Sequence, residues 1–408
     1  MKILFVTENG RSGGLDSFMV TLMNHWPYPE DEFLMICNKS HPGLKIIQMR
    51  LKRKCKIIGL RIPLNWELLP KKTEKPVLKI LRKILKKGLR YGLIPKQLRT
   101  LTKNYRKYQP DYLISVNGGY PAGEFCRLAN IAWYLFYKKG NNIHNFHNMA
   151  VEPRWFERPV ENFLDSMLKR SVDKFVTVSR TCANSMQVRP KINGSEKIDY
   201  ILNGIDTFNE DIEPSELTLK KELNLSENSS LCLMLATYEP RKGHKFLCKI
   251  FKKVLQKAPN AHLVICGYGS PEEMNVVKSL ILNYDLEDHT HLLGFRNDIS
   301  ALINQSDLLL VASQESESFG LTSVEAMALK IPVIATRVGG IPEVVSDGEG
   351  GYCFEPDDVI GYANCILQLL SDKKKRQELG EKGYLRYQKY FTGERMAKEY
   401  GKLTRLVY

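Results

Sequence analysis

Short runs of apolar residues alternate along this chain with longer segments whose apolar residues recur every three or four positions. Five runs in the second half have the length of strands: 231–236, 261–266, 291–294, 307–312 and 331–336. Helical patterns separate them, near 244–257 and up to about residue 284. Strands that alternate with helices of ten or more residues predict parallel βαβ units. Because the runs are apolar at nearly every position, both faces of the predicted sheet should be covered.

The first half follows the same order. Its strand-length apolar runs lie at 2–7, 33–37, 111–116, 133–137 and 174–178. After the first run, apolar residues with a 3.6-residue period predict one face of a helix. These residues are Leu15, Phe18, Met19, Leu22 and Trp26.

An apolar run at 198–202 ends in turn residues, which places a domain boundary at about residue 205. We therefore predict an α/β protein of two Rossmann-like, doubly wound parallel-sheet domains, 1–205 and 206–390, facing across a cleft. Ligands of such sheets bind at the carboxyl ends of the strands. Residues 391–408 predict an amphipathic helix, for which packing back on the first domain is one option.

Positive charge is concentrated in one segment. The 408 residues carry 60 Lys and Arg against 45 Asp and Glu, a formal net charge of +15. Residues 45–107 hold 21 of these bases and two acids, so this segment has a net charge of +19 and the remainder −4. A protein that coats nucleic acid would be basic throughout. We expect instead a near-neutral protein with one basic insertion between early strands, and no nucleic-acid partner.

The cysteines and the apolar runs both favour a cytoplasmic protein. The nine Cys are odd in number and contain no Cys-x-x-Cys pair, which favours reduced, buried thiols over a zinc site or a disulfide framework. No apolar run approaches the roughly 20 residues of a membrane span, and the first run is too short for a secretory signal.

Two turns after predicted strands carry groups suited to anions. In the glycine-rich turn at 8–14, Gly13 and Gly14 permit close backbone approach at a helix start, although a plain turn is equally compatible. This turn lacks the spacing of a dinucleotide fingerprint and the lysine of a P-loop. Arg241 and Lys242, before the next helical pattern, can neutralise a diphosphate, although such pairs are also common in solvated turns.

A third segment, 317–335, holds two carboxylates in a defined context. Glu317 follows a strand, Gly320 can open a helix, and Glu325 lies inside that helix. If all eight steps were helical, the two carboxylates would be about 12 Å apart along the axis. Glycosidase carboxylate pairs are roughly 5 to 9.5 Å apart, so two acceptors for sugar and ribose hydroxyls are the better interpretation.

With these segments the chain resembles glycosyltransferase family 4, the retaining nucleotide-sugar transferases of the GT-B fold. The resemblance is carried by the Glu-x7-Glu spacing from Glu317 to Glu325 with Phe319 and Gly320 between them. It extends to Val-Gly-Gly-Ile-Pro-Glu at 338–343, Leu-Gly-Phe at 293–295, the pair Gly13-Gly14, and Val-Ser at 178–179 with Asn-Gly-Ile-Asp at 203–206.

The resemblance implies roles for individual residues. As catalytic residues it implies Glu317 on the donor sugar, His147 facing that sugar, and Lys242 on the diphosphate. The implied donor-binding residues are Gly13, Gly14, Arg241, Lys242, Phe295, Phe319, Gly320, Leu321 and Glu325. One departure concerns the family's phosphate-binding Arg, because Ala236 and Thr237 stand at its usual positions. Arg241 is then the candidate replacement.

The expected chemistry separates charge, since negative charge develops on the leaving diphosphate and positive charge on the sugar. Preorganised amides and Lys242 would stabilise the leaving group. No Asp-x-Asp stands where a metal–diphosphate bridge is expected, so we expect no metal and no cofactor. The donor is a nucleotide-diphosphate sugar, with a UDP-sugar as first expectation, although the sequence identifies neither base nor sugar.

Residues 77–94 predict a basic amphipathic helix. Its polar face carries Lys79, Arg82, Lys83, Lys86, Lys87 and Arg90. Such helices lie on anionic membranes, which is the interpretation we favour, and packing of the apolar face on the first domain is the alternative. We therefore expect a hexosyltransferase-type enzyme, cytoplasmic and peripherally bound to the inner membrane face, acting on a glycan or lipid-linked acceptor in surface polysaccharide or lipopolysaccharide synthesis. A sugar-nucleotide epimerase and a non-catalytic membrane- or glycan-binding protein are the alternatives.

Overall fold

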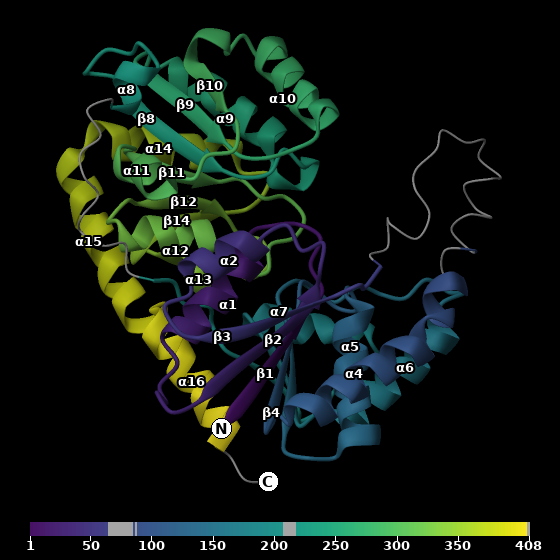
Figure 1. The fold of residues 1–408 in the computed structure, drawn as a ribbon. Helices are drawn as coiled ribbons and strands as arrows, with labels where there is room; N and C mark the ends of the chain where they lie inside the picture. Colours follow the sequence, from purple (N-terminus) through teal and green to yellow (C-terminus); the bar gives the residue numbers. More distant parts are fainter. Residues whose placement is uncertain (64–84, 86–87, 207–217, 406–408) are drawn as a thin grey trace. The chain divides into compact units, whose positions relative to one another are not determined.

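The computed structural model describes residues 1–63, 85, 88–206 and 218–405, and it divides into two compact units (Figure 1). The first unit comprises Met1–Leu202 and the chain from Met396 onward, and the second comprises Asn203–Arg395. The predicted boundary at about residue 205 lies three residues from this division. Each unit is built around its own sheet.

The first unit contains a parallel sheet with the spatial strand order β3-β2-β1-β4-β5-β6-β7. Its strands are β1 (Lys2–Thr7), β2 (Glu32–Asn38), β3 (Cys55–Leu60), β4 (Tyr112–Asn117), β5 (Asn142–Phe146), β6 (Lys174–Thr177) and β7 (Ile198–Tyr200). The central strands β1 and β4 are buried along almost their whole length, which accounts for their continuous apolar sequences.

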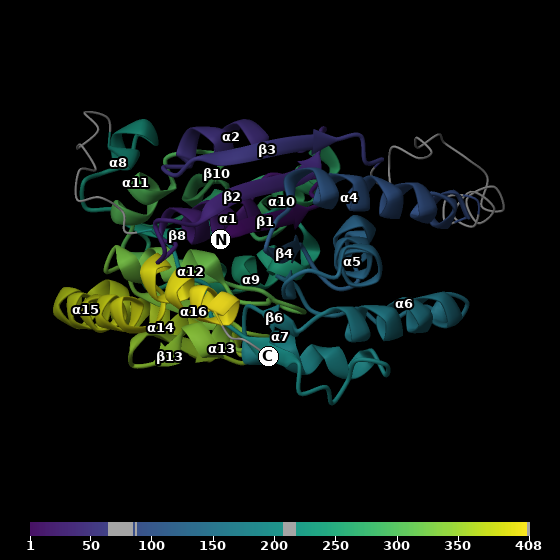
Figure 2. The same ribbon diagram turned by 60° about the horizontal axis from the view of Figure 1, so that its bottom comes forward.

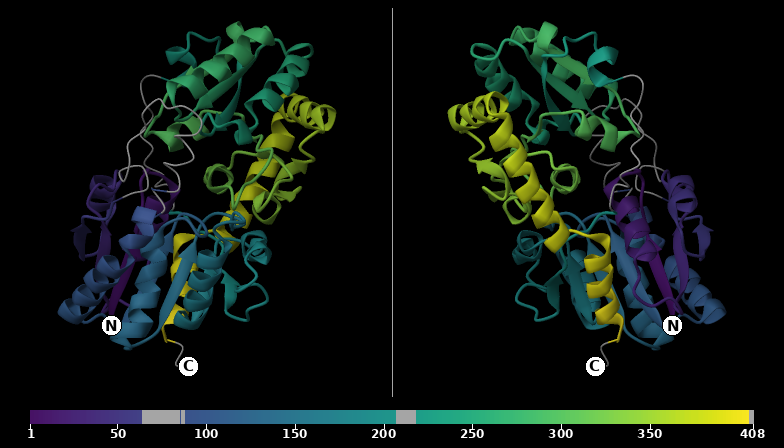
Figure 3. Two further views of the ribbon diagram at one scale, coloured as in Figure 1. Left: turned by 90° about the vertical axis from the view of Figure 1, so that its right-hand side faces the viewer. Right: turned by 90° about the vertical axis from the view of Figure 1, so that its left-hand side faces the viewer.

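Helices cover both faces of this first sheet. They are α1 (Gly14–Asn24), α2 (Leu44–Arg50), α4 (Ile94–Tyr108), α5 (Glu124–Ala132), η1 (Trp133–Tyr137), α6 (Arg158–Ser171), α7 (Arg180–Asn184), η2 (Ser185–Val188) and α16 (Gly393–Arg405). Phe18 of α1, Ile47 of α2 and Tyr400 of α16 share one core cluster on one face. Helices α4, α5 and α6 lie side by side on the other face (Figure 2). The C-terminal helix α16 runs alongside the sheet of this unit (Figure 3).

The second unit has a parallel sheet with the order β10-β9-β8-β11-β12-β14-β13. Its strands are β8 (Ser230–Leu235), β9 (Ala261–Cys266), β10 (Thr290–Leu293), β11 (Leu308–Val311), β12 (Val333–Thr336), β13 (Ser346–Asp347) and β14 (Gly350–Phe354). Its helices are α8 (Leu219–Glu222), η3 (Pro240–Lys242), α9 (His244–Leu255), α10 (Pro271–Asn283), η4 (Glu287–His289), α11 (Ile299–Asn304), α12 (Leu321–Ala328), α13 (Ile341–Val344), α14 (Val359–Ser371) and α15 (Lys373–Tyr390).

Each sheet has one point where the strand order reverses direction. In the first unit this point lies between β1 and β4, and in the second unit between β8 and β11. The loops that follow these two pairs of strands diverge to opposite faces of the sheet. Crevices at such points are where open α/β sheets bind ligands.

The prediction of two doubly wound parallel-sheet units is confirmed, but particular elements differ. The run at 133–137 was predicted as a strand and is instead the π-helical turn η1, which continues α5. The basic segment 45–107 was predicted as an insertion, yet it contributes the edge strand β3 and the covering helix α4 to the fold. Among the residues that the structure describes, no helix is both long and apolar enough to cross a bilayer.

Candidate functional site

The loops at the reversal point of the second sheet bring two sequence-predicted residues together. Lys242 ends the short helix after β8, and Glu317 lies in the loop after the neighbouring strand β11. The Lys242 Nζ atom lies 2.5 Å from Glu317 Oε2, and the Ser313 hydroxyl donates a hydrogen bond to the same oxygen at 3.3 Å. Both side chains of the ion pair remain partly exposed, 18% and 15%. A cation and a carboxylate are therefore presented together at the carboxyl end of the sheet.

The Lys242 loop is held against the Glu317 loop through the backbone. The Gln314 amide donates a hydrogen bond to the Arg241 carbonyl at 2.8 Å. Gly243 has a φ of +80°, and a Cβ atom there would lie 1.8 Å from the Ala312 carbonyl oxygen. Only glycine permits this approach, so the Gly after Lys242 fixes where the lysine stands.

A second glycine holds Glu317 from the other side. The Gly340 amide donates to the Glu317 carbonyl at 2.8 Å. Gly339 has a φ of +56°, and a Cβ atom there would lie 2.0 Å from the same carbonyl oxygen. The Gly-Gly pair in the segment 338–343 is therefore a support for the Glu317 loop.

Gly339→Ala is expected to displace the Glu317 loop, because its Cβ would overlap backbone. Gly348→Ala is the matched control, since Gly348 also has a positive φ, +80°, but open space around its Cβ position. The control should lose about 1–2 kcal/mol of unfolding free energy from the left-handed backbone alone. Gly339→Ala should lose more and should also weaken donor binding, as measured by urea unfolding and by titration with a nucleotide sugar. Equal losses in both variants would contradict this account.

The start of helix α12 is open to an anion. Gly320, with a φ of +92°, is the N-cap, and no acidic residue lies in the first turn of the helix. Amides at a helix start attract negative charge. The Phe319 ring is buried and packs edge-on against Phe391, with ring centroids 5.9 Å apart. Phe319 thus anchors the turn, and only the backbone amides of the Phe319–Leu321 turn are placed for binding. Glu325 lies in the second turn of α12.

Arg241 makes its contacts within the loops beside Lys242. Its guanidinium pairs with Glu239 in the same loop, Nε to Oε2 at 2.6 Å, and donates to the Ser316 carbonyl at 3.3 Å. Arg241 therefore braces the loop beside Lys242. The cationic side chain that faces Glu317 is Lys242.

Two exposed aromatic side chains lie at the ends of the neighbouring strands. Phe295 follows β10 and is 68% exposed, and Tyr268 follows β9 and is 63% exposed. Phe295 was predicted from the sequence and Tyr268 was not. The sequence feature that could have indicated Tyr268 is the Gly-Tyr-Gly triplet at 267–269, directly after a strand. Gly267 lets the chain pass close to the Ala236 carbonyl oxygen, because a Cβ atom on residue 267 would lie 1.8 Å from that oxygen.

In the first unit, the turn with Gly13 and Gly14 carries an acid at its helix start. The Asp16 carboxylate accepts hydrogen bonds from the Gly13 amide at 3.1 Å and from the Asn9 side chain at 3.2 Å. His41 Nε2 lies 3.3 Å from the same carboxylate. This carboxylate takes up part of the positive end of α1, so the turn is less suited to a phosphate than the start of α12.

The candidate His147 and the nearby His144 differ in their surroundings. His144 lies within β5, and its Nδ1 contacts the Ser115 hydroxyl at 2.7 Å and the Asn130 side-chain oxygen at 2.9 Å. His147 follows the strand and its ring lies edge-on to Phe18 at 4.3 Å. Its Nε2 atom is buried and has no hydrogen-bond partner among the described residues. The Nε2 atom of His144 also has no partner among the described residues, so the two rings differ in position: His144 lies inside the sheet with its Nδ1 bound, whereas His147 lies just after the strand.

Burial lowers the pKa of His147 to about 3, and burial together with the charge of Arg127 lowers the pKa of His144 to about 3. These values lie below the ordinary 6.5, so each neutral ring stabilises the fold above pH 6.5, and this stability is lost as the pH falls toward 3. At pH 5 the loss should reach at most about 2 kcal/mol per histidine. In urea unfolding at pH 7 and pH 5, His147→Phe should be less sensitive to pH than the wild type. An unchanged sensitivity would contradict the burial of a neutral ring.

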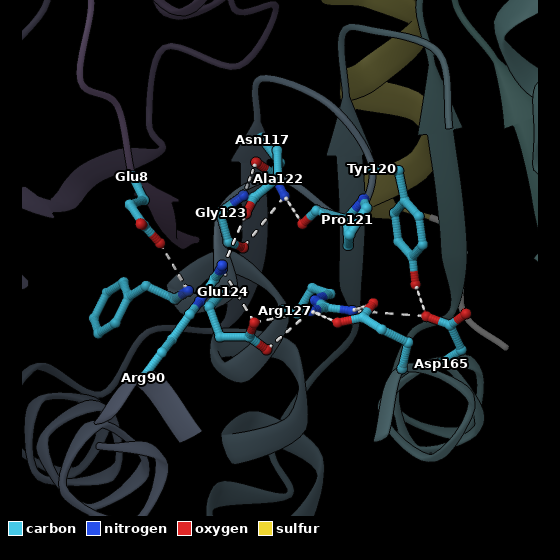
Figure 4. Close-up of polar contacts among 12 residues, drawn as sticks. Glu8, Arg90, Asn117, Tyr120, Pro121, Ala122, Gly123, Glu124, Arg127 and Asp165 are labelled. Atoms are coloured by element: carbon cyan, nitrogen blue, oxygen red, sulfur yellow. Dashed lines mark hydrogen bonds and ion pairs between the residues drawn. The ribbon is translucent and has the colours of Figure 1, made fainter. Parts of the chain in front are cut away.

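A buried network of charges lies beside the reversal point of the first sheet (Figure 4). Arg127 of α5 contacts Glu124 at 2.9 Å and Glu161 of α6 at 2.8 Å. Arg189 contacts Glu161 at 2.6 Å and Asp165 at 2.8 Å. The Tyr120 hydroxyl, at the end of the loop after β4, donates to Asp165.

The same network reaches the loop after β1. The Phe125 amide donates to Glu8 at 2.9 Å, and burial raises the pKa of Glu8. Arg90 pairs with Glu124 at 3.1 Å and donates to the Ala122 carbonyl. Arg90 was predicted to contact a membrane, and its side chain instead points into this network. The other predicted membrane residues, from Lys79 to Lys87, lie outside the described residues.

Comparison with known proteins adds a sequence family. Residues 215–386 match the family described as "Glycosyl transferases group 1". The N-acetyl-alpha-D-glucosaminyl L-malate synthase of Bacillus anthracis is 33% identical over 231 residues, which cover 56% of this chain and 58% of that protein. The chain thus spans less than two thirds of the length of this curated relative.

Solved structures resemble the chain over its whole length. A glycosyltransferase from Rickettsia africae aligns with a TM-score of 0.76 at 20% identity, covering 99% of this chain and 97% of that one. Anabaena Alr3699/HepE, solved in complex with UDP-glucose, aligns with a TM-score of 0.74 at 20% identity over 100% of both chains. At this identity the likeness concerns the fold.

Proposed function

We propose that this protein transfers a sugar from a nucleotide-diphosphate sugar, because residues 215–386 match the group 1 glycosyltransferases and the whole chain has the GT-B fold. The observation that carries the proposal is the Lys242–Glu317 pair at the reversal point of the second sheet, beside the start of α12. A cation and free helix amides suit a diphosphate, and a carboxylate suits sugar hydroxyls.

The roles of the residues follow from this placement. Lys242 and the amides at the start of α12 bind the diphosphate, and Glu317 binds the donor sugar. Glu325 binds the ribose, and Phe295 with Tyr268 flanks the base. The Glu317 carboxylate also positions the Lys242 ammonium before the donor arrives, so little reorganisation is needed during the reaction.

The reaction breaks the bond between the anomeric carbon and the β-phosphate oxygen. An acceptor hydroxyl forms the new bond on the same face, and its proton passes to the leaving phosphate oxygen, which gives retention. Lys242 and the α12 amides supply the positive charge that the leaving diphosphate needs, so protein groups, without a metal or cofactor, stabilise the leaving group. The resemblance assigns His147 to a hydroxyl of the donor sugar, and burial lowers its pKa to about 3, so its ring is neutral at physiological pH.

The setting we propose is the inner face of the cell membrane. The net charge of +19 over residues 45–107 favours an anionic surface. A lipid-linked or glycan acceptor of surface polysaccharide or lipopolysaccharide synthesis fits that location. HepE was solved in complex with UDP-glucose, and a UDP-hexose is accordingly the first donor to test.

The test begins with thermal unfolding in the presence of a panel of nucleotide sugars. A cognate donor at about 100 times its Kd should add about 2.7 kcal/mol to the unfolding free energy. The stabilising donor, with a labelled sugar, is then incubated with lipid extracts and soluble glycans. Label in a glycan or lipid supports transfer. An isomerised nucleotide sugar without acceptor would indicate an epimerase, and binding without turnover would indicate a non-catalytic protein; either result contradicts the proposal.

A further inference from the structure

The first unit exposes large apolar side chains at one end. Among the described residues, these side chains include Leu89 and four residues of the segment 151–163, namely Val151, Trp155, Val160 and Phe163. Trp155 is 80% exposed and Phe163 is 64% exposed. Exposed apolar side chains that gather at one end of a unit often mark an interaction site. We call these five residues the apolar surface.

Helix α6 presents apolar residues in two directions. Leu164 and Leu168 face the interior and are buried, whereas Val160 and Phe163 face outward. Trp155 lies in the turn before the helix, where the Arg154 carbonyl accepts amide hydrogen bonds from Glu157 at 2.8 Å and Arg158 at 3.1 Å. A surface helix ordinarily has polar residues on its outer face, so this outer face calls for a specific explanation.

The buried charge network holds the segments of the apolar surface at the same end of the unit. Arg90, next to Leu89, pairs with Glu124, and Glu124 pairs with Arg127 (Figure 4). Arg127 in turn contacts Glu161 of α6. Val151 is fixed in the same way, because its amide donates to the Tyr120 carbonyl and its carbonyl accepts from Arg189. The apolar side chains therefore extend from a rigid base.

The charge next to the apolar surface differs between its two sides. Within residues 151–163 it is mixed, with the exposed side chains of Glu152 and Arg158 paired at 2.7 Å, whereas toward α4 it has one sign. Residues 88–108 contain six Lys and Arg and no acid. Lys96, Arg99 and Lys103 of α4 are exposed. Exposed bases attract anionic lipid headgroups, and Trp and Phe side chains favour the boundary between headgroups and acyl chains. A protein partner would need a matching acidic and apolar surface, whereas an anionic bilayer offers both properties everywhere.

We propose that the apolar surface inserts into the interface of an anionic lipid bilayer, with the exposed bases of α4 on the headgroups. The membrane is the location of the proposed function, so this inference rests on that function for its setting. It differs in assigning the contact to the α6 end of the first unit and not only to the basic segment 77–94. The two proposals can fail separately.

The first experiment measures sedimentation with vesicles of phosphatidylcholine alone or mixed with phosphatidylglycerol. Trp155→Ala/Phe163→Ala should bind the mixed vesicles at least about tenfold more weakly than the wild type. Ile46→Ala/Met49→Ala is the matched control, because both residues are exposed and apolar on α2 of the same unit. The control should bind like the wild type. Equal binding by the Trp155→Ala/Phe163→Ala variant would overturn the proposal.

The second experiment observes Trp155 directly. Of the described tryptophans, Trp26 and Trp133 are buried and Trp155 is exposed, so Trp66→Phe leaves Trp155 as the exposed reporter. Adding mixed vesicles should shift its emission to the blue, and lipids with brominated acyl chains should quench it. An unchanged emission from vesicle-bound protein would overturn the proposal. The proposal would also be overturned if an added protein, and not vesicles, shifted the emission.

Donor binding separates this failure from that of the proposed function. Trp155→Ala/Phe163→Ala should retain the thermal stabilisation by the cognate nucleotide sugar. If no nucleotide sugar stabilises the wild type, the proposed function fails whatever the vesicles show. If the variant retains both donor and vesicle binding, the proposed apolar contact alone fails.

Discussion

Lys242→Ala is expected to lower kcat/KM for sugar transfer by about 10²–10³-fold, because it removes the cation that stabilises the leaving diphosphate. It also leaves Glu317 without its partner at 2.5 Å, so a carboxylate charge stands where the diphosphate must bind. Donor affinity should therefore fall together with the rate. The measurement is release of the nucleoside diphosphate with the donor that stabilises the wild type.

Lys245→Ala is the control for this variant, since Lys245 is exposed on α9 three residues further along the chain. It should keep wild-type activity. Glu317→Gln should lower activity as well, because the amide neither positions Lys242 nor accepts equally from the donor sugar. Activity within threefold of wild type in Lys242→Ala would mean that the diphosphate binds elsewhere.

Arg127→Met is expected to cost about 3–5 kcal/mol of unfolding free energy at neutral pH, because two buried carboxylates, Glu124 and Glu161, each lose one of their two arginine partners. Arg127 is almost fully buried between Glu124 and Glu161. Burial alone would raise the pKa of Glu161, but Arg127 and Arg189 outweigh it and lower this pKa to about 2. The carboxylate therefore stabilises the wild type above pH 4.5, and this contribution is lost as the pH falls toward 2.

The pH dependence provides a specific check on this prediction. In Arg127→Met, the Glu161 pKa should rise and protonation should relieve the excess negative charge, so the difference from wild type should narrow as the pH falls from 7 to 4. Arg170→Met, at an exposed arginine of α6, the helix that carries Glu161, should change stability by less than about 0.5 kcal/mol. A constant difference from pH 7 to pH 4 would show that lost packing, and not charge, is responsible.

Most of the fold could be predicted because its strands are short and uniformly apolar. Ala261–Cys266 was located at its observed bounds for this reason. The prediction of a strand at Trp133–Tyr137 was wrong, because five consecutive apolar residues are compatible with a buried strand and with a helix. Here the segment continues helix α5. Strand β14 was missed because Gly350 and Gly351 indicate a turn by composition, whereas Gly351 allows close approach to the Val333 carbonyl.

The placement of candidate residues could be predicted where they are close in sequence. Glu317 and Gly320 lie between β11 and α12 with Glu325 in α12 itself, and Arg241 and Lys242 lie in one turn after β8. The sequence did not reveal that Arg241 pairs with Glu239, since the same sequence allows the arginine side chain to point toward Glu239 or toward a ligand. The charge network escaped prediction because its members extend from Glu8 to Arg189 and meet only when α5 and α6 pack together.

Calorimetric titration with UDP tests the central claim most directly, namely that the Lys242–Glu317 site binds the diphosphate of a nucleotide sugar. The wild type should bind UDP more tightly than UMP, and Lys242→Ala should abolish that difference while Lys245→Ala preserves it. Equal affinity for UDP in the wild type and in Lys242→Ala would contradict the account.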